Sequence, residues 1–254
     1  MGQAPAPQST RVPLVAWPLV ALRAILMLAL LAACLPGYYL WRLLGLPRFW
    51  PRVFLAGTGV IAGLRVTVRG THLPNALLIA NHVSWLDILA IARVTGSAFV
   101  GHSGLASVTL IRHLCAMNDT VFIARHDRAS VADQVEQVRF AIADTGALTI
   151  FPEGTTSNGT SLLPFKSSLL SAAEDLPEGA AVQPLLLAYE EAAEVAWVGE
   201  EHGLTNFLRI LARARPVRLV LHFLPELEGE ALAGRKAIAA AARAEIEQAM
   251  GQAR

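Results

Sequence analysis

From residue 65 onward, short apolar and β-branched runs alternate with longer stretches that have a helical pattern. The runs that predict strands are 65–69, 76–80, 97–101, 120–125, 147–152, 181–189 and 217–224. The stretches that predict helices are 85–95, 106–117, 130–144, 164–174 and 230–250. This alternation is typical of an α/β fold in which helices flank a layered, mostly parallel sheet. The strand order does not follow from it, and the acidic segment 190–204 predicts a surface excursion.

The residues before this alternation are far more apolar. Only Arg23 and Arg42 are charged within 12–46, and the uncharged run 24–41 approaches the roughly 20 residues that cross a bilayer. We therefore expect an N-terminal hydrophobic helix that associates with a membrane. The Pro36-Gly37 pair inside the run predicts that this helix is bent or re-entrant.

The flanks of the apolar run predict its orientation. Aromatic residues gather at its C-terminal end, as at the headgroup level of a membrane, together with Arg42, Arg48 and Arg52, whereas only Arg11 is basic upstream of the apolar stretch 12–46. The positive-inside rule places the main domain on the cytoplasmic side of the cytoplasmic membrane. A second apolar stretch, 53–64, is too short to span and would lie in the interface or pack on the domain. We divide the chain into a membrane-anchoring segment, 1–64, and an α/β domain, 65–254.

Two other interpretations of the apolar run stay open. Leu31-Ala32-Ala33-Cys34 resembles a lipoprotein cleavage box, although apolar rather than polar residues follow it. The run is also short enough to be a helix of the protein core.

Composition narrows the classes of function. The chain is 54% hydrophobic and only 16% charged, with a net charge of +1, so no overall field favours nucleic acid as a partner. The two cysteines, Cys34 and Cys115, offer neither a disulfide framework nor the spacing of metal ligands, so no metal site is predicted.

The segment NHVSWLD (81–87) follows the predicted strand 76–80, where catalytic groups of parallel sheets gather. On one helix, positions five apart lie about 140° around the axis, so His82 and Asp87 would not meet. We interpret Ser84 as the helix N-cap, with Asp87 in the first turn and directed back to His82. Asp87 would bind one ring nitrogen, leaving the other to take a proton from a hydroxyl. The alternative is a helix-capping Asp87 beside an ordinary loop histidine.

Two further strand ends carry polar residues. Arg125 suits a phosphate or carboxylate, although an ion pair with a neighbouring aspartate explains it equally well. After strand 147–152, the Glu153-Gly154 turn allows close approach of backbone N–H groups to an anionic oxygen, and Lys166 begins the next helix. The alternative for 151–166 is a polar loop with ordinary turn chemistry.

A nucleophilic serine is a rival candidate for the chemistry. Ser103 lies in VGHSGL (100–105), which misses the G-x-S-x-G elbow because Leu105 replaces the last glycine. An α/β-hydrolase using Ser103 therefore remains an alternative enzyme class.

Taken together, the strand ends resemble the glycerolipid acyltransferase family, the 1-acylglycerol-3-phosphate acyltransferases and their relatives. The resemblance covers about residues 60–225 and rests on four blocks in order. The matching residues are Asn81, His82 and Asp87; Phe122, Ile123 and Arg125; Phe151, Pro152, Glu153, Gly154, Thr155 and Ser157; and Val182-Gln183-Pro184. Each block alone is a weak signal, but the four together in this order are a strong one.

The resemblance implies transfer of a fatty acyl group from acyl-CoA or acyl carrier protein to the free hydroxyl of a lysolipid at a membrane, in membrane lipid biosynthesis. It implies His82 as the general base and Asp87 as the group that orients it. No cofactor is expected, since the acyl-CoA or carrier protein is a co-substrate. The residues expected to bind substrate are Asn81, Ser84, Phe122, Ile123, Arg125, Glu153, Gly154, Thr155, Thr156 and Lys166.

The departures from the family pattern bear on the acceptor. Thr156 replaces an arginine of the third block that is thought to bind the acceptor phosphate. The EGTTSNG version resembles branches that act on other lysolipids, including lyso-ornithine lipid. Because lysophosphatidate is the family's commonest acceptor, 1-acylglycerol-3-phosphate is the first predicted acceptor, and lyso-ornithine lipid or another lysophospholipid is the alternative.

Overall fold

A computed structural model describes residues 12–46, 49–102, 117, 121–123, 140–177, 179–199 and 201–252. Within these residues, seven strands form one sheet in the order β1-β7-β6-β2-β5-β3-β4. They are β1 (Leu64–Arg69), β2 (Ala76–Ala80), β3 (Ala98–His102), β4 (Val121–Ile123), β5 (Ala147–Ile150), β6 (Ala181–Tyr189) and β7 (Val217–Phe223). Neighbours are parallel except β6 and β7, so the predicted α/β fold is confirmed.

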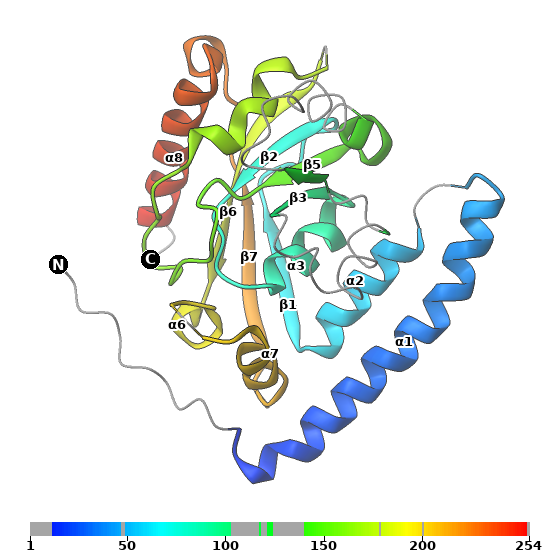
Figure 1. Cartoon of the computed structure of the whole chain (residues 1–254). Helices are drawn as coiled ribbons and strands as arrows, with labels where there is room; N and C mark the ends of the chain where they lie inside the picture. Colours follow the sequence, from blue (N-terminus) through cyan, green and yellow to red (C-terminus); the bar gives the residue numbers. More distant parts are fainter. Residues whose placement is uncertain are drawn as a thin grey trace.

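Helices cover both faces of this sheet (Figure 1). The described α-helices are α1 (Trp17–Leu43), α2 (Trp50–Ile61), α3 (Leu86–Thr95), α6 (Ala192–Val195), α7 (Gly203–Leu211) and α8 (Arg235–Gln252). The described 3₁₀ helices are η1 (Leu14–Ala16), η4 (Ser167–Asp175) and η5 (Gly229–Leu232). One core cluster joins the sheet to α3 and α7, and a second joins its other face to α8 and η4.

Strand β2 shows how the sequence produces this layering. Successive side chains of a strand point to opposite faces. Leu78 and Ala80 pack in the cluster with α3, whereas Leu77 and Ile79 pack in the cluster with α8. All five residues of β2 are buried, as expected for the central strand of a parallel sheet.

Several predicted boundaries differ from the structure. The segment predicted as a helix over 164–174 is the 3₁₀ helix η4, and the segment 230–250 divides into η5 and α8. The segment 190–204 is not a simple surface excursion, because it contains α6 and the start of α7, and Val195 and Ala196 are buried. The helices predicted over 106–117 and 130–144 lie mostly outside the described residues.

Helix α1 is continuous from Trp17 to Leu43, so a re-entrant break at Pro36-Gly37 is not seen. Proline removes one intrahelical hydrogen bond, but the helix continues for two turns beyond it. Gly37 has a packing reason: a Cβ there would lie 2.2 Å from the Trp50 side chain. The glycine therefore lets α2 approach α1 closely.

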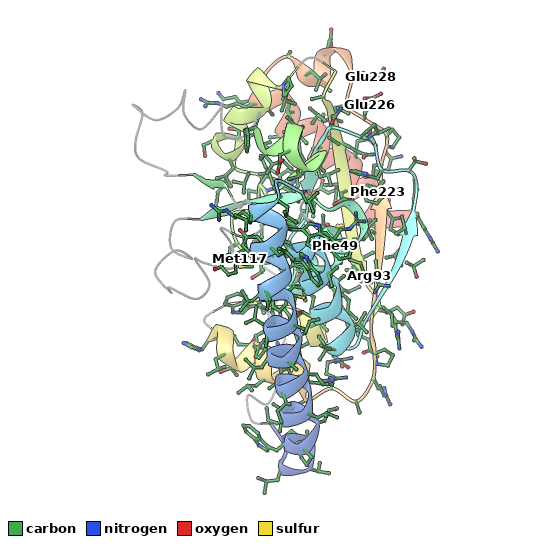
Figure 2. The ribbon with its side chains drawn as sticks, turned by 90° about the vertical axis from the view of Figure 1, so that its right-hand side faces the viewer. Phe49, Arg93, Met117, Phe223, Glu226 and Glu228 are labelled. Carbon is green, nitrogen blue, oxygen red and sulfur yellow. The ribbon has the colours of Figure 1, made fainter. Side chains whose placement is uncertain are left out.

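Helix α1 lies along the outside of the domain. With η1 it forms Leu14–Leu43, the one stretch of the described chain long and apolar enough to cross a membrane. Only 11% of its most apolar window is buried, which argues against the alternative of a core helix. Cys34, the residue of the lipoprotein alternative, is buried within α1. Figure 2 looks at this side and shows α1, in blue, running from the middle of the domain to the lower end of the molecule.

Candidate active site

The site forms where β2, β5 and β6 end side by side. β5 and β6 flank β2 in the sheet and run parallel to it. The segments that follow these strands therefore meet at one edge of the sheet, as expected for parallel strands. His82 and Glu153 lie in the segments after β2 and β5, and Tyr189 is the last residue of β6.

His82 and Asp87 are in direct contact. The His82 Nδ1 and Asp87 Oδ2 atoms are 2.8 Å apart, and the Asp87 side chain is fully buried while that of His82 is 18% exposed. A carboxylate only accepts hydrogen bonds, so Nδ1 carries a hydrogen and is the donor of the bond to Asp87. In the neutral ring, Nε2 then holds the lone pair that a general base needs.

The backbone just before α3 explains how these residues meet. Asp87 Oδ2 also accepts from the backbone N–H groups of Val83 (2.7 Å) and Ser84 (3.0 Å). Helix α3 begins at Leu86 with Trp85 as its N-cap and no side-chain cap bond, so the prediction of Ser84 as the N-cap is wrong, and the Ser84 hydroxyl accepts only a long 3.4 Å bond from Leu86 N–H. The Asp87 carboxylate therefore holds the backbone just before the helix and binds His82 at the same time.

The loop after β5 holds His82 from both sides of its backbone. His82 N–H donates to Glu153 Oε1 (2.7 Å), and His82 C=O accepts from Ser157 N–H (2.7 Å) and Ser157 Oγ (3.0 Å). The imidazole also stacks on Phe151, with ring centroids 4.1 Å apart and planes inclined by 17°. These contacts fix both the backbone and the ring of His82.

Glu153, a predicted substrate-binding residue, is buried beside the backbone of His82. The sequence predicts that it binds polar groups of the acceptor, but it is 1% exposed and its two oxygens are occupied. Oε1 accepts from His82 N–H and Oε2 from Leu163 N–H (2.8 Å). Burial raises the pKa of Glu153, while these hydrogen bonds and the nearby His82 act in the opposite direction. The geometry favours a structural support for the His82 loop.

Asn81 and Ser84, two other predicted substrate-binding residues, are also fully buried. Asn81 donates from its amide nitrogen to Leu187 C=O (3.1 Å) and accepts from Leu187 N–H (2.7 Å). Its side chain thus extends the pairing of β2 with β6 beyond the end of β2. The geometry favours positioning roles for both residues rather than direct contact with substrate.

The remaining predicted residues fall into two groups. Gly154, Thr155 and Thr156 lie in the loop after β5, near the His82–Asp87 pair. Gly154 has a left-handed φ of 68°, Thr155 is exposed, and the Thr156 hydroxyl donates to Trp197 C=O. Lys166 is exposed, with its N–H bonded to Pro152 C=O (2.8 Å). Away from this loop, the structure gives the backbone position of Phe122 and Ile123 in β4, and Arg125 and Ser103 lie outside the described residues.

Tyr189 is a site residue that the sequence analysis missed. Its hydroxyl donates to Asp87 Oδ1 at 2.5 Å. Burial, followed by the charge of Asp87 and this hydrogen bond, raises the pKa of Tyr189 well above its ordinary value of 10.0. The available signal was its place at the end of a predicted strand, but its contact with Asp87 depends on the unpredicted pairing of β6 with β2.

Comparison with known proteins identifies the family. The family model named Acyltransferase matches residues 65–188, a region that includes the His82–Asp87 pair. A lyso-ornithine lipid O-acyltransferase of Rhodobacter capsulatus is 32% identical over 200 residues, which cover 76% of this chain and 72% of that protein. The chain belongs to the acyltransferase family. The resemblance found in its sequence is therefore confirmed.

Other relatives have two kinds of name. A lyso-ornithine lipid O-acyltransferase of Rhizobium meliloti is 38% identical over 151 residues, or 57% of this chain and 50% of that protein. A 1-acyl-sn-glycerol-3-phosphate acyltransferase of Neisseria gonorrhoeae is 36% identical over 155 residues, or 57% of this chain and 58% of that protein. The match thus spans about half the length of these two relatives.

A solved structure supports the fold over nearly the whole chain. The 1-acyl-sn-glycerophosphate acyltransferase PlsC of Thermotoga maritima superposes with a TM-score of 0.61, covering 92% of this chain and 93% of that one. The two sequences are 19% identical, so this comparison supports the architecture and leaves the substrate to other observations.

Proposed function

We propose that the protein transfers a fatty acyl group from a thioester donor, acyl-CoA or acyl carrier protein, to the hydroxyl of a lysolipid. The observation that carries this proposal is the His82–Asp87 pair, held at 2.8 Å within the region that matches the family. His82 Nε2 removes the proton of the acceptor hydroxyl as its oxygen attacks the thioester carbon. The C–S bond then breaks, and the imidazolium returns the proton to the leaving thiolate. General-base catalysis of this kind contributes roughly 10²–10⁴-fold.

Lyso-ornithine lipid is the acceptor that we propose first, with 1-acylglycerol-3-phosphate as the second candidate. The sequence alone predicts the opposite order, because lysophosphatidate is the commonest acceptor in the family. Thr156 stands where the family pattern has an arginine, and its hydroxyl is bonded to Trp197 C=O. The names of the Rhizobium and Rhodobacter relatives agree with this choice, whereas that of the Neisseria relative favours lysophosphatidate.

We also propose that α1 lies in the plane of the cytoplasmic membrane surface instead of crossing the bilayer. Near its start, Arg23 donates to Leu211 C=O (3.0 Å) and Arg213 C=O (2.9 Å) at the end of α7. Near its other end, Gly37 packs against Trp50. A spanning orientation would bring part of the domain into the hydrocarbon, where polar groups are costly. The division of the chain at residue 64 remains a prediction.

A panel of donors and acceptors tests the proposed function. Purified protein in nanodiscs would receive labelled acyl-CoA or acyl carrier protein with lyso-ornithine lipid, lysophosphatidate or lysophosphatidylethanolamine. We expect acylated product with lyso-ornithine lipid and its loss in His82→Ala, while His222→Ala, which alters a half-buried histidine of β7, retains activity. Turnover of lysophosphatidate alone would reverse the order of acceptors, and no turnover of any pair would reject the function.

A further inference from the structure

Tyr189 reaches Asp87 because of the way β2 and β6 pair. Asn81 holds both backbone groups of Leu187, one residue beyond the end of β2. Residues two apart on a strand point to the same face, so Leu187 and Tyr189 share a face. Tyr189 is the last residue of β6, and its hydroxyl lies 2.5 Å from Asp87 Oδ1. The sheet therefore delivers a phenol to the side of the carboxylate opposite His82.

The two oxygens of Asp87 have separate partners. Among the described hydrogen bonds, Oδ2 accepts from His82 Nδ1 and from the N–H groups of Val83 and Ser84, while Oδ1 accepts from Tyr189. Asp87 is fully buried, and a buried carboxylate needs hydrogen bonds to remain ionised. Hydrogen bonds to a charged acceptor are roughly twice as strong as neutral ones. The phenol therefore stabilises negative charge on Oδ1, away from the oxygen that binds His82.

Tyr189 is suited to remain a donor. Burial and the adjacent carboxylate hold its pKa well above 10.0, so the phenol keeps its proton at neutral pH. The following segment also packs on the catalytic loop, because Trp197 N–H donates to Val83 C=O at 3.0 Å and Trp197 C=O accepts from Thr156. The segment from 189 to 197 thus packs against the site at both of its ends, and Tyr189 is the residue of this segment that contacts the His82–Asp87 pair.

We propose that Tyr189 is a positioning residue that sets the basicity of His82 through Asp87. This inference rests on the proposed function, since it assigns His82 as the base. Without the phenol, negative charge concentrates on Oδ2, which favours the imidazolium and raises the pH at which His82 becomes a free base. Among the described residues, the titratable groups in contact with His82 are Asp87 of α3 and Glu153 of the loop after β5, and Tyr189 of β6 contacts Asp87.

Tyr189→Phe tests the proposal, because it removes only the hydroxyl. We expect kcat to fall about 10-fold, since a lost hydrogen bond to a charged group has an effect of this order, with little change in lysolipid KM. The acidic limb of the kcat/KM profile should move to higher pH, and the His82 ring signals in an NMR titration should move in the same direction. Tyr39→Phe, on α1, is the matched control and should change neither measurement.

A second variant keeps the test decisive if Tyr189→Phe unfolds. Difluorotyrosine incorporated at position 189 retains the ring and hydroxyl but is a stronger donor, so it should move the acidic limb to lower pH. If Tyr189→Phe and the difluorotyrosine variant both show the same pH profile and the same His82 titration as the wild-type protein, the proposed role of Tyr189 is overturned. If His82→Ala is inactive at the same time, the proposed function stands; if His82→Ala retains activity, the function itself fails.

Discussion

Glu153→Gln distinguishes a structural support from a substrate-binding residue. The wild-type carboxylate accepts from His82 N–H at 2.7 Å and from Leu163 N–H at 2.8 Å, in a position that is 1% exposed. A glutamine has one oxygen and one NH₂ group, so one of these two N–H groups loses its acceptor. An unpaired buried N–H costs about 1–3 kcal/mol, and a neutral acceptor in the other bond costs about 1 kcal/mol more. We expect the free energy of unfolding to fall by about 2–4 kcal/mol.

The assay combines urea unfolding with steady-state kinetics. Loss of the support displaces His82, so kcat should fall together with stability, while the KM for lysolipid changes little. Glu226→Gln, at an exposed position after β7, should leave both quantities unchanged. A raised KM with wild-type stability would refute this reasoning and restore the prediction that Glu153 binds the acceptor.

The pH dependence of stability tests the direction in which burial shifts the pKa of Glu153. Burial raises the folded-state pKa of Glu153 above its ordinary value of 4.5. A carboxyl with a raised pKa favours the folded state most below its unfolded pKa, and this contribution disappears as pH rises through the folded pKa. The stability of wild type relative to Glu153→Gln should therefore increase as pH falls from neutral toward about 4.5. A constant or decreasing difference would contradict the assigned direction.

Three further substitutions test the packing around the site, each by urea unfolding of the purified protein. Asn81→Ala removes both bonds to Leu187 and should cost about 2–3 kcal/mol; an unchanged midpoint would contradict its positioning role. Gly37→Ala forces a Cβ against Trp50 and should cost about 1–3 kcal/mol, and an unchanged midpoint would contradict the close packing of α2 on α1. Arg23→Met leaves two carbonyls at the end of α7 without this donor and should lower stability by about 1–3 kcal/mol. Wild-type stability would remove the argument that Arg23 fixes α1 on the domain.

The local features of the site follow well from sequence. The spacing of Ser84 and Asp87 predicts a first-turn carboxylate that faces back to His82, and the structure confirms this contact. Apolar runs also predict the strands closely, because a buried parallel strand is apolar on both faces. Both predictions depend on interactions between residues that are close in the chain.

The features that sequence did not predict depend on long-range pairing. Tyr189 meets Asp87, and Asn81 meets Leu187, only because β6 lies beside β2 in the sheet. In the same way, the sequence shows Glu153 only as a carboxylate in a loop. Its role as a buried support depends on the packing of the loop after β5 on His82. Helix α7 was not predicted; it begins at the end of the acidic segment 190–204, where His202 accepts from Leu204 N–H, and continues to Leu211.

Single-turnover acyl transfer by His82→Gln tests directly whether His82 is the general base. The variant preserves a polar side chain of similar length but has no imidazole base. We expect a chemical step slower by about 10²–10⁴-fold, with a circular dichroism spectrum and unfolding midpoint like those of wild type. A wild-type rate in the folded variant would contradict the assignment of His82 as the base.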